Sequence, residues 1–224
     1  RRSSDLIVTD VAEAESVVRV RQTQVHGQLR VGSSVAFGRR VVVPLALEFM
    51  AQNPQVQLDL SFEDRYTDLV AHGIDVAIRL GKLADSALGA RTLGMNPWVL
   101  VASPHYLKKH GTPRRPSDLK EHATLIYSSV QGNDVWRLRN ASGEAVSVPV
   151  SGRLRSNNLS ALLAAARAHM GIAALPWYVA HDSLAAGRVV EVLKTCRLPE
   201  QEIHAVYPSP RLVPQKVQAF IAFL

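Results

Sequence analysis

Cysteine is almost missing from this sequence, since Cys196 is the single one among 224 residues. A lone cysteine excludes an internal disulfide and a zinc site made of several thiolates, and it fits a reducing compartment. No apolar run approaches the roughly 18 residues that span a membrane. Residues 1–10 lack the apolar core and the small-residue cleavage site of a signal peptide. We therefore expect a cytoplasmic protein that has no membrane partner.

Recognisable catalytic and nucleotide-binding motifs are missing as well. The chain has no HExxH metal pair, no GxSxG nucleophile turn, no phosphate-binding P-loop and no GxGxxG dinucleotide motif. Its eight histidines are scattered, and the carboxylates Asp59, Asp64, Asp68 and Asp75 are spread over several predicted elements. Structural or surface roles suit these residues better than catalysis. We expect no enzyme activity, no bound metal and no cofactor.

Apolar residues, in contrast, are plentiful enough for a substantial core. They make up 47% of the chain and charged residues 20%, a balance that excludes wholesale disorder. The length suits one large domain or two domains of roughly 100 residues each. Lysine and arginine outnumber the acidic residues by 26 to 19, and the net charge of +7 permits an anionic partner without specifying one.

Strand-like and helix-like segments alternate through the first part of the chain. Short or alternating apolar runs predict strands at residues 29–32, 56–62 and 74–80. Helices are predicted between them, at residues 38–53 and 64–73. Short connections between strands and helices in this order predict parallel α/β units.

The character of the sequence changes after Pro104, where basic and polar stretches predict smaller elements and a second domain. The remaining predictions are strands at residues 98–104, 172–176, 188–193 and 202–208, β-structure with turns over 136–155, and helices at 158–171, 177–187 and 212–224.

The segment before this α/β pattern differs from the rest. Apolar residues Val11, Ala14, Val18 and Val25 recur at helical spacing. A helix with so narrow an apolar stripe does not fold alone, so it packs on a partner helix or another domain. The alternative is a solvated tail.

Two helix starts carry hydroxyl and amide side chains that suit an anion. The first predicted strand runs into Ser33 and Ser34, and residues 156–158 precede the helix at Leu159. Exposed backbone N–H groups and the helix dipole bind a carboxylate at such places. In open α/β sheets, ligands favour the carboxyl ends of strands, and a cleft between lobes is a common site. The alternative is that Ser34 and Asn157 or Asn158 are ordinary N-caps.

These segments, in this order, resemble the effector-binding domain of a LysR-type transcriptional regulator. The resemblance covers nearly all of residues 28–224 and rests on order and spacing over the whole stretch. The matching stretches are GQLRVGSSVAFGRRVVVPLALEFMAQNPQVQLDL, DLVAHGIDVAIRLGKLADSALGARTLG, WVLVASPHYLKKHGTPRRPSDLKEH, WRLRNASGEAVSVPVSGRLRSNN, MGIAALPWYVAHDSLAAGRVVEVL and IHAVYP.

The resemblance implies an α/β fold similar to type 2 periplasmic binding proteins. Two α/β subdomains are joined by two crossover strands and preceded by a linker helix. The implied division is a linker helix at 1–27, subdomain I at 28–102 plus 204–224, and subdomain II at 103–203. The linker would connect to a winged helix-turn-helix DNA-binding domain, which this sequence does not contain.

The resemblance also implies a small effector, an organic acid by preference, held between the two lobes. Carried over by position, the candidate ligand-binding residues are Ser33, Ser34, Phe37, Gly81, Ser103, Tyr127, Ser128, Asn157, Asn158, Leu175 and Pro176. Arg155 is a candidate counter-ion, with an ordinary surface arginine as the alternative.

Members of this family form dimers through the effector domain and tetramers when the linker helices also pair. The implied interface sets residues 39–53 and 56–62 of one chain beside the helix from Leu159 to Met170 of another; packing within one core is the alternative. The implied function is ligand-responsive transcription regulation, with DNA bound through the N-terminal domain. A solute-binding receptor of an uptake system shares the fold and is the rival interpretation.

Overall fold

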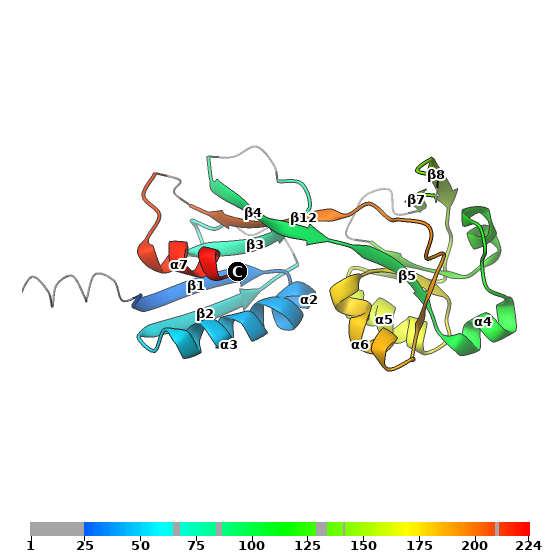
Figure 1. Cartoon of the computed structure of the whole chain (residues 1–224), viewed down its shortest axis with the longest axis horizontal. Helices are drawn as coiled ribbons and strands as arrows, with labels where there is room; N and C mark the ends of the chain where they lie inside the picture. Colours follow the sequence, from blue (N-terminus) through cyan, green and yellow to red (C-terminus); the bar gives the residue numbers. More distant parts are fainter. Residues whose placement is uncertain (1–24, 65–67, 84–86, 129–133, 141, 209–210) are drawn as a thin grey trace, which may run out of the picture.

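The protein has two lobes that lie side by side along its longest axis (Figure 1). The structure is a computed structural model, and it describes residues 25–64, 68–83, 87–128, 134–140, 142–208 and 211–224. The predicted linker helix lies outside these residues except for its last three positions. No helix among the described residues is long and apolar enough to cross a bilayer.

A five-stranded sheet forms the first lobe. Its strands, in spatial order, are β2 (Val56–Phe62), β1 (Gly27–Ser33), β3 (Val76–Leu80), β12 (Gln201–Tyr207) and β4 (Gly89–Asn96). β1 is parallel to β2 and β3, whereas β12 is antiparallel to β3 and β4. The predicted parallel α/β pattern is confirmed for the first three strands.

Helices cover one face of this sheet. They are α2 (Val35–Phe37), η1 (Gly38–Val42, a π-helical turn), α3 (Val43–Gln52) and α7 (Gln215–Phe223). Leu29 and Val31 of β1 point to this face and pack in one cluster with Phe49 and Phe220, in keeping with the two-residue repeat of a strand. A Cβ atom at Gly38 would lie 2.3 Å from Cδ1 of Phe62, so this close approach of helix to strand requires glycine.

A second five-stranded sheet forms the other lobe. Its strands, in spatial order, are β11 (Val190–Val192), β5 (Trp98–Ala102), β10 (Ile172–Pro176), β6 (Thr124–Tyr127) and β9 (Leu154–Ser156). A separate hairpin pairs β7 (Val135–Arg139) with β8 (Ala145–Pro149). The helices are α4 (Pro104–His110), η2 (Pro116–Glu121, a 3-10 helix), α5 (Leu159–Arg167) and α6 (Trp177–Ala185).

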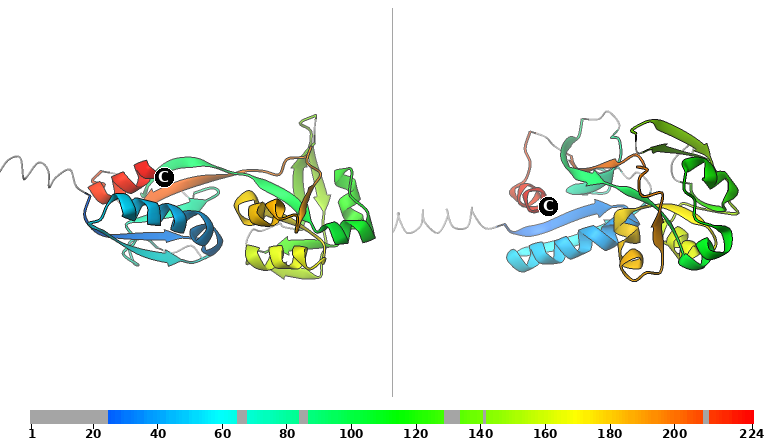
Figure 2. Two further views of the ribbon diagram at one scale, coloured as in Figure 1. Left: turned by 60° about the horizontal axis from the view of Figure 1, so that its bottom comes forward. Right: turned by 45° about the vertical axis from the view of Figure 1, so that its right-hand side comes forward.

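Two passes of the backbone join the lobes. The chain leaves the first sheet after β4 and enters the second at β5, with Pro97 between them, and it returns between β11 and β12. Figure 2 shows the two passes as the green and orange segments that connect the lobes. Because β5 belongs to the second sheet and Gln201 already belongs to the first, we propose lobes of 28–97 plus 201–224 and of 98–200.

Several elements differ from the sequence predictions, and β6 and α2 are among those that were not predicted. The described part of the predicted helix at 64–73 consists of turns, in which the Asp68 carboxylate accepts hydrogen bonds from the N–H groups of Val70 and Ala71 and Gly73 follows with a φ of 60°. α5 ends at Arg167, four residues before the predicted stop, and His169 follows with a φ of 65°. β4 was not predicted, since its sequence GARTLGMN has no clear alternation.

Candidate functional site

A pocket of about 210 Å³ lies between the two lobes. We call it the interlobe pocket. Its lining residues come from both sheets: Ser34, Ala36, Glu63, Asp64, Ile78, Arg79, Leu80, Trp98, Tyr127, Asn157, Asn158, Leu159, Pro176, Tyr178 and Gln201. This volume lies below the roughly 300–1,000 Å³ of pockets for drug-sized ligands, so it suits a small molecule.

The first-lobe wall begins where the parallel strands β1 and β2 end. Ser34 follows β1, and its side chain makes no capping hydrogen bond to the helix that starts at Val35. Instead, the Asp64 carboxylate after β2 accepts the N–H of Val35 at 3.0 Å. The helix start that we expected to bind an anion is therefore occupied by a carboxylate of the protein itself.

The charges of the lining sit on the first lobe. Glu63 and Asp64 supply two carboxylates, and Arg79 of β3 supplies a guanidinium. Arg79 comes from a strand whose neighbouring residues Ile78 and Leu80 also line the pocket. With one cation against two anions, the described lining has a formal charge of −1.

The second-lobe wall contains the start of α5. The Oδ1 atom of Asn158 accepts the N–H of Ala161 at 3.1 Å, so Asn158 is the N-cap of this helix. Its own N–H donates to the Ser156 hydroxyl at 3.0 Å. Asn157 is exposed, lines the pocket and does not cap α5. The N-cap interpretation thus holds for Asn158 and fails for Ser34 and Asn157.

Aromatic side chains close one side of the pocket. Tyr178 of α6 contacts Phe37 of α2 edge to face, with ring centroids 5.0 Å apart. Burial raises the pKa of the Tyr178 phenol well above its usual range, and the neighbouring Tyr127 adds to this shift. The phenol therefore stays protonated and able to donate a hydrogen bond across the physiological pH range.

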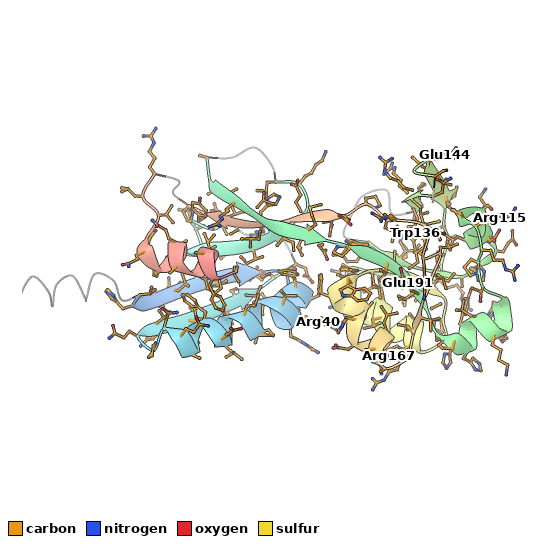
Figure 3. The ribbon with its side chains drawn as sticks, viewed as in Figure 1. Arg40, Arg115, Trp136, Glu144, Arg167 and Glu191 are labelled. Carbon is orange, nitrogen blue, oxygen red and sulfur yellow. The ribbon has the colours of Figure 1, made fainter. Side chains whose placement is uncertain are left out.

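Further contacts fix the lobes relative to each other. The Arg40 guanidinium donates to the Ser160 hydroxyl at 3.3 Å, and Figure 3 shows Arg40 at the boundary between the lobes. At the crossovers, Oε1 of Gln201 accepts from Nε1 of Trp98 at 2.9 Å and from Nδ2 of Asn96 at 3.1 Å. Trp98 and Gln201 thus line the pocket and also tie its two connecting strands together.

The predicted ligand residues divide into two groups. Ser34, Tyr127, Asn157, Asn158 and Pro176 line the interlobe pocket. The structure brings them together from β1, β6, β10 and the start of α5, as the prediction of a site between lobes requires.

The other predicted residues lie outside this lining. Four of them are buried: Ser33 donates to the carbonyl of Ile78, Phe37 lies behind Tyr178, Ser103 is the N-cap of α4, and Leu175 belongs to the second-lobe core. Gly81 turns the chain after β3 with a φ of +89°. Ser128 is exposed beyond β6.

Arg155 also lies outside the lining. It is exposed and forms an ion pair with Asp134, which agrees with the alternative of an ordinary surface arginine. Arg79 takes the place of the expected positive charge in the pocket.

Several lining residues were missed, and some had a signal in the sequence. Glu63 and Asp64 follow β2 just as Ser34 follows β1, and adjacent parallel strands end at the same edge of a sheet. Arg79 interrupts an otherwise apolar strand. Trp98 and Gln201 carry no such signal, because their place depends on how the two crossovers meet. Among the described residues, no group of three or more His, Cys, Asp or Glu side chains is placed to hold a metal ion.

Comparison with known families identifies the domain. The model of the family described as the LysR substrate binding domain matches residues 22–224. The transcriptional regulator DmlR of Escherichia coli is 34% identical over 222 residues, which cover 97% of this chain and 71% of DmlR. An uncharacterised HTH-type regulator of Haemophilus influenzae is 32% identical over 94% of this chain and 73% of its own length.

Solved structures agree with this result. The regulatory domain of CrgA, a LysR-type regulator from Neisseria meningitidis, has a TM-score of 0.78 and 28% identity, and it covers 88% of this chain and 97% of that domain. Full-length AphB, a Vibrio cholerae virulence activator, has a TM-score of 0.78 and 26% identity over all of this chain and 78% of AphB. The predicted type 2 periplasmic-binding-protein-like fold is confirmed. The chain belongs to the LysR-type transcriptional regulators, and residues 22–224 form their substrate-binding domain.

Proposed function

We propose that this domain senses a small effector in the interlobe pocket and passes the signal to a DNA-binding region outside this sequence. The observation that carries the proposal is a pocket whose walls come from both lobes, with Ser34 on one side and Asn157 on the other. A ligand that contacts both walls favours the closed arrangement of the lobes over an open one. It shifts that balance only by its difference in affinity for the two arrangements.

We infer that the effector is an organic acid. The Arg79 guanidinium and the amide of Asn157 suit a carboxylate, and the nearby start of α5 adds a favourable dipole. Glu63 and Asp64 disfavour a second carboxylate on the same ligand. They favour an acid that also carries an ammonium group or several hydrogen-bond donors, such as an amino acid or a hydroxy acid.

A thermal-shift screen of small carboxylic, hydroxy and amino acids tests this assignment. A ligand at 100 times its dissociation constant adds about 2.7 kcal/mol to the free energy of unfolding, which raises the melting temperature measurably. We expect the double variant Ser34→Ala, Asn157→Ala to lose this shift. Ser128→Ala is the matched control, because Ser128 is exposed outside the lining, and it should keep the shift.

The outcome separates the candidate positions of the site. A shift that survives in the double variant would place the effector elsewhere, and a shift lost in the Ser128→Ala control would point to the wider β6 loop. If no acid stabilises the wild-type chain while uncharged or cationic compounds do, the organic-acid assignment is wrong. The interlobe pocket then remains the proposed effector site.

We further propose that the chain forms a homodimer, or a homotetramer in the longer protein. An exposed apolar stripe runs along α3 and contains Pro44, Leu47, Met50 and Ala51, with the half-buried Val43 beside it. Leu47 is 61% exposed, and Met170 beyond α5 is 52% exposed. Exposed apolar side chains grouped in this way are typical of an interface, and these two segments are the ones that the family resemblance pairs.

The proposal places the protein in the cytoplasm, where DNA is accessible, and makes it a binding module rather than an enzyme. The relatives above are named as transcriptional regulators, which supports this interpretation. The rival, a solute-binding receptor of an uptake system, has only the shared fold in its favour.

A further inference from the structure

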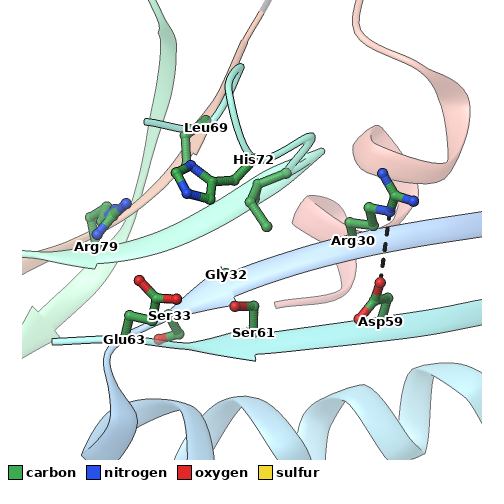
Figure 4. A pocket seen from close by; sticks show the side chains of 10 residues that line it. Arg30, Gly32, Ser33, Asp59, Ser61, Glu63, Leu69, His72 and Arg79 are labelled. Carbon is green, nitrogen blue, oxygen red and sulfur yellow. Dashed lines mark ion pairs between the residues drawn. The ribbon is translucent and has the colours of Figure 1, made fainter. Parts of the chain in front are cut away.

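A second pocket, of about 390 Å³, lies within the first lobe. We call it the first-lobe pocket. It sits on the sheet face opposite α3, because Arg30 and Gly32 alternate with the core-facing Leu29 and Val31 of β1. Figure 4 shows its side chains above β1 and β2, with α3 on the other side of the sheet. The turn at residues 68–74 covers part of it through Leu69 and Ile74.

The charges in this pocket are balanced. Arg30 and Asp59 form an ion pair, with Nε and Oδ2 3.7 Å apart. Glu63 and Arg79 lie at the end of the pocket away from the Arg30–Asp59 pair (Figure 4) and also line the interlobe pocket. Two carboxylates against two guanidiniums leave no net charge for an ionic ligand to neutralise. Such a ligand would have to be desolvated without a charge to compensate it.

Hydrogen-bond donors and acceptors stand next to each other in the same space. The Nδ1 atom of His72 lies 2.9 Å from the carbonyl of Asp68. A carbonyl only accepts, so Nδ1 carries a proton and donates it to this carbonyl. Ser61 lies between the Arg30–Asp59 pair and Glu63 (Figure 4), and its hydroxyl both donates and accepts.

We propose that the first-lobe pocket is a second ligand site, for a small uncharged polyhydroxylated molecule such as a monosaccharide or an inositol. A hydroxyl group can donate to a carboxylate and accept from a guanidinium at the same time, so a ring of hydroxyls uses both kinds of charge. Hydrogen bonds to ionised partners are the strong ones. Leu69 and Ile74 supply an apolar surface for the C–H groups of such a ligand. This site is distinct from the interlobe pocket, although the two pockets share Glu63 and Arg79.

Saturation-transfer NMR on the 224-residue chain tests the proposal, with D-glucose, D-galactose, D-ribose and myo-inositol as separate probes. We expect at least one probe to give a signal. Ser61→Phe puts a ring into the pocket at an exposed position of a strand, where phenylalanine is well tolerated. It should weaken binding by about tenfold or more, because the lost hydrogen bonds involve charged partners.

The matched control is Gln57→Phe. Gln57 is exposed on the same strand and the same face, but outside the lining, so the signal should persist. Asp59→Asn is a second variant that keeps the shape of the side chain and removes its charge, and it should also weaken the signal. The proposal is overturned if no probe gives a signal, or if the signal survives both Ser61→Phe and Asp59→Asn.

A further variant separates this proposal from the proposed function. Ser34→Ala with Asn157→Ala should leave the sugar or inositol signal intact, because neither residue lines the first-lobe pocket. Loss of the signal in that variant would mean that the probes bind in the interlobe pocket, which overturns the second site. Failure of the acid screen, in turn, would leave the first-lobe site untouched.

Discussion

At the scale of single residues, the second lobe contains a buried histidine whose charge state is tied to its hydrogen bond. The Tyr106 hydroxyl accepts the N–H of Ala123 at 3.0 Å and lies 3.2 Å from Nδ1 of His122. The hydroxyl still has its proton, which it can donate to Nδ1 of a neutral imidazole. Burial lowers the pKa of His122, and the nearby His110 lowers it further, against the opposing effect of Asp118 and Glu121.

The lowered pKa predicts loss of stability in acid. The unfolded chain, with an ordinary histidine pKa near 6.5, binds the proton more readily than the folded protein. The stabilising contribution is therefore complete above about pH 6.5 and falls as the pH drops through the lower folded-state value. Urea unfolding at pH 7.5 and 5.5 should show this loss, and His122→Gln should reduce it while costing about 1 kcal/mol at pH 7.5 for the hydrogen bond.

His26 provides the comparison for this test. It lies outside the second lobe, ahead of β1, so His26→Gln removes one histidine without touching the contact between Tyr106 and His122, and the loss of stability in acid should persist. An equal loss of stability in acid for wild type and His122→Gln would mean that other groups cause it.

At the scale of elements, two neighbouring asparagines at the start of α5 have different expected effects, one on stability and the other on effector binding. Asn158 caps the helix and Asn157 does not. We expect Asn158→Ala to lower the free energy of unfolding by about 1 kcal/mol, as the loss of an N-cap does. Asn157→Ala should leave stability nearly unchanged and weaken effector binding. Urea unfolding and effector titration of both variants check this, and a reversed pattern would contradict the assigned roles.

How far the sequence could predict these elements depends on where their contacts come from. β1, β2 and β3 were predicted because each shows its own apolar pattern. The segment at 68–73 was predicted as part of a helix, but Asp68 accepts from Val70 and Ala71 as an N-cap does and Gly73 turns the chain at a φ of 60°, so only a short turn fits between them.

Local sequence patterns also predicted part of the candidate site. Ser34 and Asn157 follow or precede regular elements, so their place at a sheet edge or helix start can be read from the chain. Trp98 and Gln201 meet through a hydrogen bond between residues 103 positions apart. Contacts of that kind depend on how the whole chain folds, and no local pattern encodes them.

At the scale of the whole molecule, the exposed stripe on α3 predicts self-association. Leu47→Glu places a charge in the middle of this stripe, where burying it in an interface would be unfavourable. In a symmetric dimer the change is present on both protomers. We therefore expect a weakening of the dimer by about tenfold or more, since burial of one leucine side chain contributes about 1.5–3 kcal/mol. Analytical ultracentrifugation over a concentration series measures it.

Gln52→Glu is the control for charge on the same helix. Gln52 is exposed on the neighbouring face, beside Glu48, whose carboxylate accepts its amide at 3.5 Å. The association constant should not change. Dimers that persist in Leu47→Glu would show that α3 is not in the interface.

The position of β12 has a consequence for the way this protein is made. β12 lies between β3 and β4 in the first sheet, although residues 97–200 separate it from β4 along the chain. During synthesis, β3 and β4 therefore leave the ribosome long before the strand that joins them. Their open edges can pair with other chains until that strand arrives. The lobe that is translated first is thus the last to be completed, and a nascent chain arrested before residue 201 would lack a closed first sheet.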